Sequence, residues 1–136
     1  MSTDPSVIRS FAISVDDIVT AYEAARDGKP VVLRVTPPFS GRMRARIHHS
    51  REINNQETIH IDPDTLIDDD SPAYPTPEET EDQLRASERE YSVETHHAFH
   101  VEAVQEWRNA VRSHVVSEIT LETPAGLHTV EVKPLG

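Results

Sequence analysis

The longest stretch with one clear hydrophobic period runs from Ser92 to Val116. Its apolar residues recur at steps of three and four, which places them on one side of an α-helix. Ser92 stands where an N-cap is expected, and neither glycine nor proline interrupts the pattern before Pro124. The pattern predicts a long amphipathic helix that needs a partner layer. Its expected inner stripe is Val93, His97, His100, Val104, Trp107, Val111 and Val115.

A shorter helix is predicted over about Val15–Asp27. Ser14 or Asp16 can serve as its N-cap, because a side-chain oxygen there can accept hydrogen bonds from the first backbone N–H groups. Gly28 follows at the position where helices commonly end. The apolar residues of this helix also share one side, so it too needs an apolar partner.

Residues 68–76 are rich in aspartate and proline and are expected to form a linker within the domain. At its end, Thr76, Pro77 and Glu79 give the pattern of a capping box with proline in the first turn. This pattern predicts a helix over roughly Pro77–Arg89. Because the helix has few apolar residues, we expect it to lie at the surface.

The remaining segments alternate apolar and polar residues, which is the period of a β-strand. A loop around Asn54–Asn55 and a turn at residues 124–126 separate neighbouring segments. We predict an α+β fold in which a mostly antiparallel sheet of about five strands packs on the long helix, in the order (β)αβββααββ. The segments with the strand pattern are Val7–Ser14, Val31–Thr36, Arg42–His48, Glu57–Ile61, Val116–Glu122 and Leu127–Lys133.

The two strands around the turn PPFSG are predicted to have one apolar and one basic face. With the turn centred on Phe39, Arg34 stands opposite Arg44, and Arg46 stands opposite Val32. Like charges that face each other across a strand pair are unfavourable unless something neutralises them. The basic face, our candidate for binding a partner or an anion, carries Arg34, Arg42, Arg44, Arg46 and, at its end, His48.

Three arrangements could neutralise this basic face. Acidic segments of the same chain could cover it, another subunit could cover it, or a phosphate-bearing ligand could bind there. Arginine suits ion pairs with carboxylates, whereas few aromatic residues accompany the basic face for stacking on nucleic-acid bases. We therefore expect a protein partner or a second copy of the chain, with nucleic acid as the alternative.

Length and composition indicate one domain over residues 1–136, with residues 1–6 as a flexible tail. The chain has no cysteine, which excludes disulfides and thiolate chemistry. No apolar run reaches the ~18 residues of a membrane span, and no signal-peptide pattern opens the chain. We expect a cytoplasmic protein without a membrane partner.

The charge of the chain is strongly negative and unevenly distributed. The net charge is −11, and only Lys29 and Lys133 of the 13 basic residues are lysine. This composition is typical of a protein kept soluble in very high salt, where self-repulsion is screened within ~3 Å. We expect the melting temperature to rise between low and multimolar KCl. Residues 1–51 carry five acidic and eight basic residues, whereas residues 52–136 carry 19 and five, an asymmetry that can mark an anion-binding surface.

Four histidines on or near the long helix are candidate metal ligands: His96, His97, His100 and His114. His96 and His100 are four residues apart, so both rings could reach one ion. The competing interpretation is that His97 and His100 are neutral core residues, each hydrogen-bonded to a carbonyl or a carboxylate. With no cysteine and no HExxH motif, we expect no cofactor, and a divalent metal ion remains the alternative.

No phosphate loop, dinucleotide fingerprint or nucleophile elbow is present. The stretches VVLRVTPPFSGRMRARIHH, DSPAYPTPEETEDQLR and TPAGLHTVEVK resemble short acidic haloarchaeal proteins of an uncharacterised family. The resemblance implies a cytoplasmic archaeal setting and brings no activity or catalytic residue. The leading hypothesis is a non-enzymatic binding or assembly module that uses its basic sheet face. The alternative is a histidine-cluster metal-binding protein or small metalloenzyme.

Overall fold

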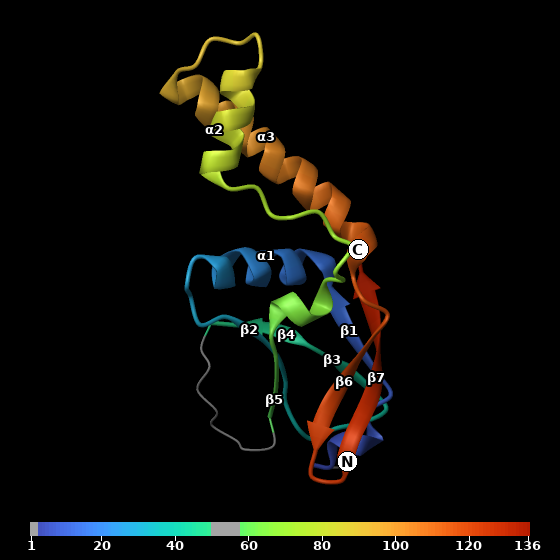
Figure 1. Cartoon of the computed structure of the whole chain (residues 1–136). Coiled ribbons are helices and arrows are strands. Elements are labelled where there is room, and N and C mark those ends of the chain that lie inside the picture. Colours follow the sequence, from blue (N-terminus) through green and yellow to red (C-terminus); the bar gives the residue numbers. More distant parts are fainter. Residues whose placement is uncertain (1–2, 50–57) are drawn as a thin grey trace. The chain divides into compact units, whose positions relative to one another are not determined.

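The structure is a computed structural model, and it describes residues 3–49 and 58–136. The chain forms two compact units. The first comprises the chain up to Asp68 together with Val115–Gly136, and the second comprises Asp69–His114. Helices and strands are both present and segregated along the chain, so the predicted α+β class is confirmed (Figure 1). The single domain over residues 1–136 stays a prediction.

The first unit holds two sheets, mostly antiparallel when taken together, in place of the single sheet of about five strands that the sequence predicted. One sheet has the order β3-β1-β7-β6, and its strands are β1 (Ser10–Ser14), β3 (Arg42–Arg44), β6 (Glu118–Thr123) and β7 (Gly126–Leu135). The other has the order β4-β2-β5, and its strands are β2 (Val32–Val35), β4 (Arg46–His48) and β5 (Ile59–Ile61). Strand β1 is the exception to antiparallel pairing, because it runs parallel to both β3 and β7.

The predicted strand over residues 42–48 is divided between the two sheets at Ala45. Strand β3 pairs with β1, and only β4 pairs with β2. Arg34 therefore stands opposite Arg46, not opposite Arg44 as predicted. This shift of two residues leaves every side chain on its predicted face, because side chains alternate with a period of two. Phe39, the expected centre of the turn, is only 1% exposed, since a phenyl ring is stabilised by burial in the core.

One apolar core joins the two sheets, and α1 (Val15–Arg26) packs on it. Ser14 caps this helix by accepting a hydrogen bond from the Asp17 N–H at 3.4 Å. Figure 1 shows α1 lying across one end of the strands. The packing of the sheet on the long helix, which belongs to the second unit, stays a prediction. Prominent buried residues of the core are Ile8, Phe11, Ile13, Ile18, Leu33, Val35, Leu66 and Val130.

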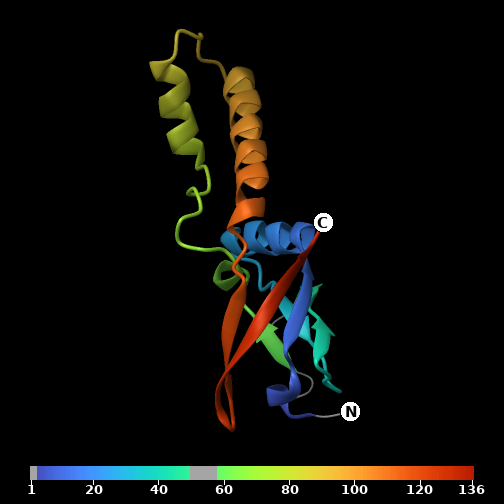
Figure 2. The same ribbon diagram turned by 90° about the vertical axis from the view of Figure 1, so that its right-hand side faces the viewer.

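The second unit is a helical hairpin made of α2 (Pro77–Ala86) and α3 (Val93–Val111), which lie side by side in both views (Figure 2). Both predicted caps are present. Thr76 Oγ1 accepts from the Glu79 N–H at 3.2 Å, and Ser92 Oγ accepts from the Thr95 N–H at 3.0 Å. Within residues 3–49 and 58–136, no helix combines the length and the apolar character needed to cross a membrane.

The inner stripe predicted for the long helix is partly wrong. Trp107 and Val111 are buried as expected, but Val93 is 77% exposed and His97 is exposed as well. The side chain that turns toward α2 in this part of the helix is His96. His100, which the predicted stripe included, also contacts α2 through Thr80.

Short 3₁₀ helices connect several of these elements, at Pro5–Val7, Pro63–Leu66 and Arg112–His114. The first begins within the tail predicted for residues 1–6, where Asp4 accepts a hydrogen bond from the Ser6 N–H at 3.0 Å. The loop predicted around Asn54–Asn55 lies outside the described residues.

Candidate functional site

Three arginines occupy alternate positions of β3 and β4, and we call Arg42, Arg44 and Arg46 the arginine strip. All three are exposed. The residues between them face the opposite way: Ala45 is buried in the core, and Met43 packs against it. The strip is therefore carried by backbone whose position is fixed by core packing, and only the arginine side chains are free to adapt.

Four of the five predicted binding residues line one shallow depression of about 490 Å³: Arg34, Arg44, Arg46 and His48. Arg34 stands opposite Arg46 on one side and opposite His60 on the other, so three basic side chains form a row across β5, β2 and β4. The fifth residue, Arg42, lies in a neighbouring depression together with Arg9 and Lys133. The predicted basic residues thus line two depressions, one at β2, β3 and β4 and the other at β1, β3 and β7.

The electrostatic environment of the strip differs from that of its basic neighbours. Lys133 Nζ forms an ion pair with Glu131 Oε1 at 2.8 Å, and Arg34 has an interaction of its own. Among residues 3–49 and 58–136, no ion pair is described for Arg42, Arg44 or Arg46. The strip therefore presents positive charge that the described carboxylates do not neutralise.

Strand β1 leaves room beside the strip. Ser10 is the partner of Arg42, and Ala12 is the partner of Arg44 in the parallel β1–β3 pair. Both side chains are small, so a guanidinium group can lie flat over β1 or turn outward without a steric clash. A planar guanidinium can then bind a carboxylate with two parallel hydrogen bonds.

The sequence interpretation missed three basic residues of this surface. His60 could have been found, because Ile59 and Ile61 were assigned to the apolar face and alternation then places His60 on the basic one. Arg9 and Lys133 reach the same surface only because β1 and β7 lie beside β3. No local pattern in the sequence indicates those long-range pairings.

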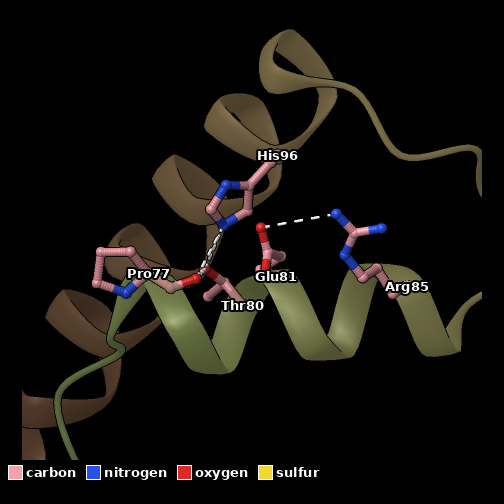
Figure 3. A network of polar contacts seen from close by, with 5 residues as sticks. All are labelled: Pro77, Thr80, Glu81, Arg85 and His96. Carbon is pink, nitrogen blue, oxygen red and sulfur yellow. Dashed lines mark hydrogen bonds and ion pairs between the residues drawn. The ribbon is translucent and has the colours of Figure 1, made fainter.

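Of the four candidate metal ligands, the structure brings two together. His96 Nε2 and His100 Nδ1 each lie 2.9 Å from Thr80 Oγ1, and Thr80 is only 1% exposed. Figure 3 shows His96 pointing at Thr80 and at the Pro77 carbonyl, which is 3.0 Å from the same ring nitrogen. Across the described ranges 3–49 and 58–136, no group of three or more metal-binding side chains is placed to hold an ion.

The other two histidines lie elsewhere: His97 is exposed, and His114 is in the 3₁₀ turn that follows α3. A metal site involving these residues stays a prediction. The histidine at the C-terminal hairpin, His128, has a structural contact instead. Its Nε2 lies 2.6 Å from the Ile8 carbonyl oxygen, which can only accept, so this ring nitrogen donates.

The contacts of Thr80 form one satisfied network. A carbonyl oxygen can only accept, so the hydrogen bond to Pro77 requires a proton on His96 Nε2. The same N–H also points at Thr80 Oγ1. The threonine hydroxyl can then donate either to His100 Nδ1 or to the Thr76 or Pro77 carbonyl, at 2.9 to 3.2 Å. The network joins the two helices through polar atoms.

The rest of the second unit is also held by specific polar and aromatic contacts. Trp107 Nε1 donates to the Pro72 carbonyl at 3.0 Å, and the Tyr74 ring meets the indole edge to face at 4.7 Å. Arg85 lies 3.8 Å from the centre of the Tyr91 ring. It also forms an ion pair with Glu81 at 3.8 Å (Figure 3). These contacts and the Thr80 network hold the helical hairpin together.

The geometry defines an acidic α+β chain with one exposed cationic strip and a helical hairpin. The chain belongs to the family described as Domain of unknown function (DUF8009), whose model matches residues 1–136. The uncharacterised family that the sequence resemblance implied is therefore confirmed, whereas the haloarchaeal source stays a prediction. The comparison with curated proteins gave no match, and the comparison with solved structures gave none either.

Proposed function

We propose that the chain is a non-enzymatic binding module of a salt-rich cytoplasm, and that the arginine strip binds an acidic protein surface. The observation that carries this proposal is the exposure of Arg42, Arg44 and Arg46 on a rigid sheet without a described ion-pair partner. Arg42, Arg44 and Arg46 lie at alternate positions on one face, so their like charges repel one another, and a bound anion would relieve this repulsion.

An acidic protein fits the strip better than nucleic acid does. In molar salt, counterion release contributes little to nucleic-acid binding, because its driving force falls with the logarithm of the salt concentration. Among the described residues that line the depression there is no phenylalanine, tyrosine or tryptophan to stack on a base. Short bidentate bonds between guanidinium and carboxylate groups act within the ~3 Å over which molar salt still permits electrostatic attraction.

A pull-down from native lysate in multimolar KCl tests this function, with and without nuclease, reading both protein and nucleic acid. The strip variant carries Arg44→Glu together with Arg46→Glu, which reverses the charge at both positions. Its matched control, Lys29→Glu with Arg89→Glu, makes the same change in net charge at exposed positions that are not part of the strip. We expect the wild type and the control to retain a protein partner that the strip variant loses.

Two outcomes would contradict the proposal. Capture that survives in the strip variant would show that the arginines are not the contact surface. A captured partner that disappears with nuclease would make the strip a nucleic-acid surface instead of a protein-binding one.

A further inference from the structure

A cleft of about 1060 Å³ opens between strands β5 and β6, entirely within the first unit. Each of these strands is the last strand of its sheet. The cleft slightly exceeds the range of about 300–1,000 Å³ that is usual for small-molecule pockets. Its size and its position between two strands therefore suit an extended segment of chain.

The cleft exists because the two sheets are joined on one side only. On that side the chain passes from β3 to β4 through Ala45, whose N–H donates to the Ala12 carbonyl at 3.1 Å. On the other side, β5 and β6 are not paired with each other within the described residues. Contact there is made beyond the strands, where the Val116 N–H donates to the Leu66 carbonyl at 3.0 Å. A strand added at this edge would lie between the two sheets.

The edge of β6 offers backbone groups to such a strand. Val132 donates to the Ser117 carbonyl at 2.8 Å, which fixes the phase of the antiparallel β6–β7 pair. Because hydrogen-bonded and non-bonded pairs alternate, the N–H and C=O groups of Glu118, Thr120 and Glu122 point away from β7 and toward the cleft. An edge of this kind is a template for the addition of another strand.

The side chains around the cleft specify the chemistry of that strand. Its floor is apolar, because Ile59, Ile61, Ile119 and Leu121 all pack against the core. Its rim carries the carboxylates of Asp4, Asp62, Glu118 and Glu122, and His60 also lines the cleft. A strand presents alternate residues to opposite sides, so a segment that alternates apolar and basic residues would match both surfaces.

We propose that this cleft binds an extended segment of a partner protein, with alternating apolar and basic residues, as an added β-strand between β5 and β6. Backbone hydrogen bonds to the β6 edge supply affinity, and the acidic rim with its apolar floor selects the sequence. The cleft is separate from the arginine strip and attracts the opposite charge. The inference goes beyond the proposed function and does not depend on it.

Titration of the full chain with two synthetic peptides tests the proposal by fluorescence anisotropy. One six-residue peptide with blocked ends alternates valine and arginine, and the other alternates valine and glutamate. We expect the arginine peptide to bind and the glutamate peptide not to bind. Amide hydrogen exchange should also slow at Glu118, Thr120 and Glu122 when the arginine peptide is present, because their N–H groups gain partners.

Two variants separate strand addition from general attraction to an acidic protein. Thr120→Pro removes an outward N–H without touching the pairing to β7, a position where an edge strand tolerates proline. It should weaken binding about tenfold, whereas Thr120→Val, which keeps the N–H, should bind as the wild type does. Glu118→Gln with Glu122→Gln should weaken binding in low salt. Its matched control, Glu88→Gln with Glu90→Gln in the helical hairpin, should not.

Equal binding by Thr120→Pro and Thr120→Val would overturn strand addition. An equal loss of peptide binding in the two glutamine double variants would show that binding depends only on the net charge of the chain. If Thr120→Pro does not fold, as judged by circular dichroism, the glutamine pairs and the exchange of the three amides decide the question.

Discussion

The two units of this chain are stabilised in different ways. The first unit buries a continuous apolar core between two sheets and α1, in which residues such as Phe11 and Leu33 are completely inaccessible to solvent. In the helical hairpin, a central contact between α2 and α3 is polar: the Thr80 hydroxyl with two histidine rings. Apolar packing is non-directional and tolerant of small shifts, whereas a hydrogen-bond network requires particular partners at particular angles.

The two kinds of contact contribute differently: apolar burial supplies stability, and the polar contacts specify which residues pair. The apolar core of the first unit supplies most of the favourable free energy of burial. The polar contacts of the hairpin contribute less net free energy, because each replaces a hydrogen bond to water. They do, however, determine which residues of α2 and α3 meet, and the network pairs Thr80 with His96 and His100.

The largest expected effect comes from truncating the apolar core. Phe11→Ala should lower the free energy of unfolding by about 3–5 kcal/mol, because it removes buried surface and leaves a cavity. The same substitution at half-exposed Phe99 of α3 should cost less than about 2 kcal/mol. Urea unfolding in multimolar KCl, followed by circular dichroism, measures both. Equal losses of unfolding free energy in the two variants would show that the two units do not differ in how much they depend on apolar burial.

A smaller effect is expected from the polar contact of the hairpin. Thr80→Val keeps the side-chain shape but leaves His96 and His100 without their common partner. The free energy of unfolding should fall by about 1 kcal/mol, at the low end of the range for an unpaired buried group, because both rings are only half-buried. Thr80→Ser keeps the hydroxyl, so its histidine ¹⁵N chemical shifts should match those of the wild type. A valine variant as stable as the wild type would show that the network contributes no net stability.

The smallest effect concerns the N-terminal turn of the first unit. Hydrogen bonds from Ser6 hold the pKa of the Asp4 carboxyl below its ordinary value of 3.8, and the nearby His128 acts in the same direction. A depressed folded-state pKa gives stability that is fully present above pH 3.8 and is lost as the pH falls through the lower value. The difference in melting temperature between the wild type and the Asp4→Asn variant should therefore shrink below pH 3.8. A difference that stays constant through this range would contradict the assignment.

Local signals predicted the helices well. Ser14, Thr76 and Ser92 each cap the helix expected after them, because a cap depends on residues only three positions apart. The C-terminal hairpin was also predicted, and Gly126 supplies the positive φ of +113° at its turn.

Contacts between distant residues could not be predicted in this way. Nothing near residues 10–14 indicates that β1 runs parallel to β3 and β7, since parallel partners are separated by long crossovers. This error did not change which side chains were assigned to the basic face, because alternation along a strand fixes the face of each side chain whatever strand lies beside it. The Thr80 network was missed because periodicity locates an inner stripe but cannot specify which side chain of α2 will meet it.

The bridge between Ile67 and Val115 also bears on how this chain could change over evolutionary time. The chain leaves the first unit for the helical hairpin beside the place where it returns. The length of the hairpin can therefore vary without altering the register of any strand. Each doubling of that length adds only about 0.6 kcal/mol of closure entropy. We therefore expect this position to accept a shorter or longer hairpin without disturbing the sheets of the first unit.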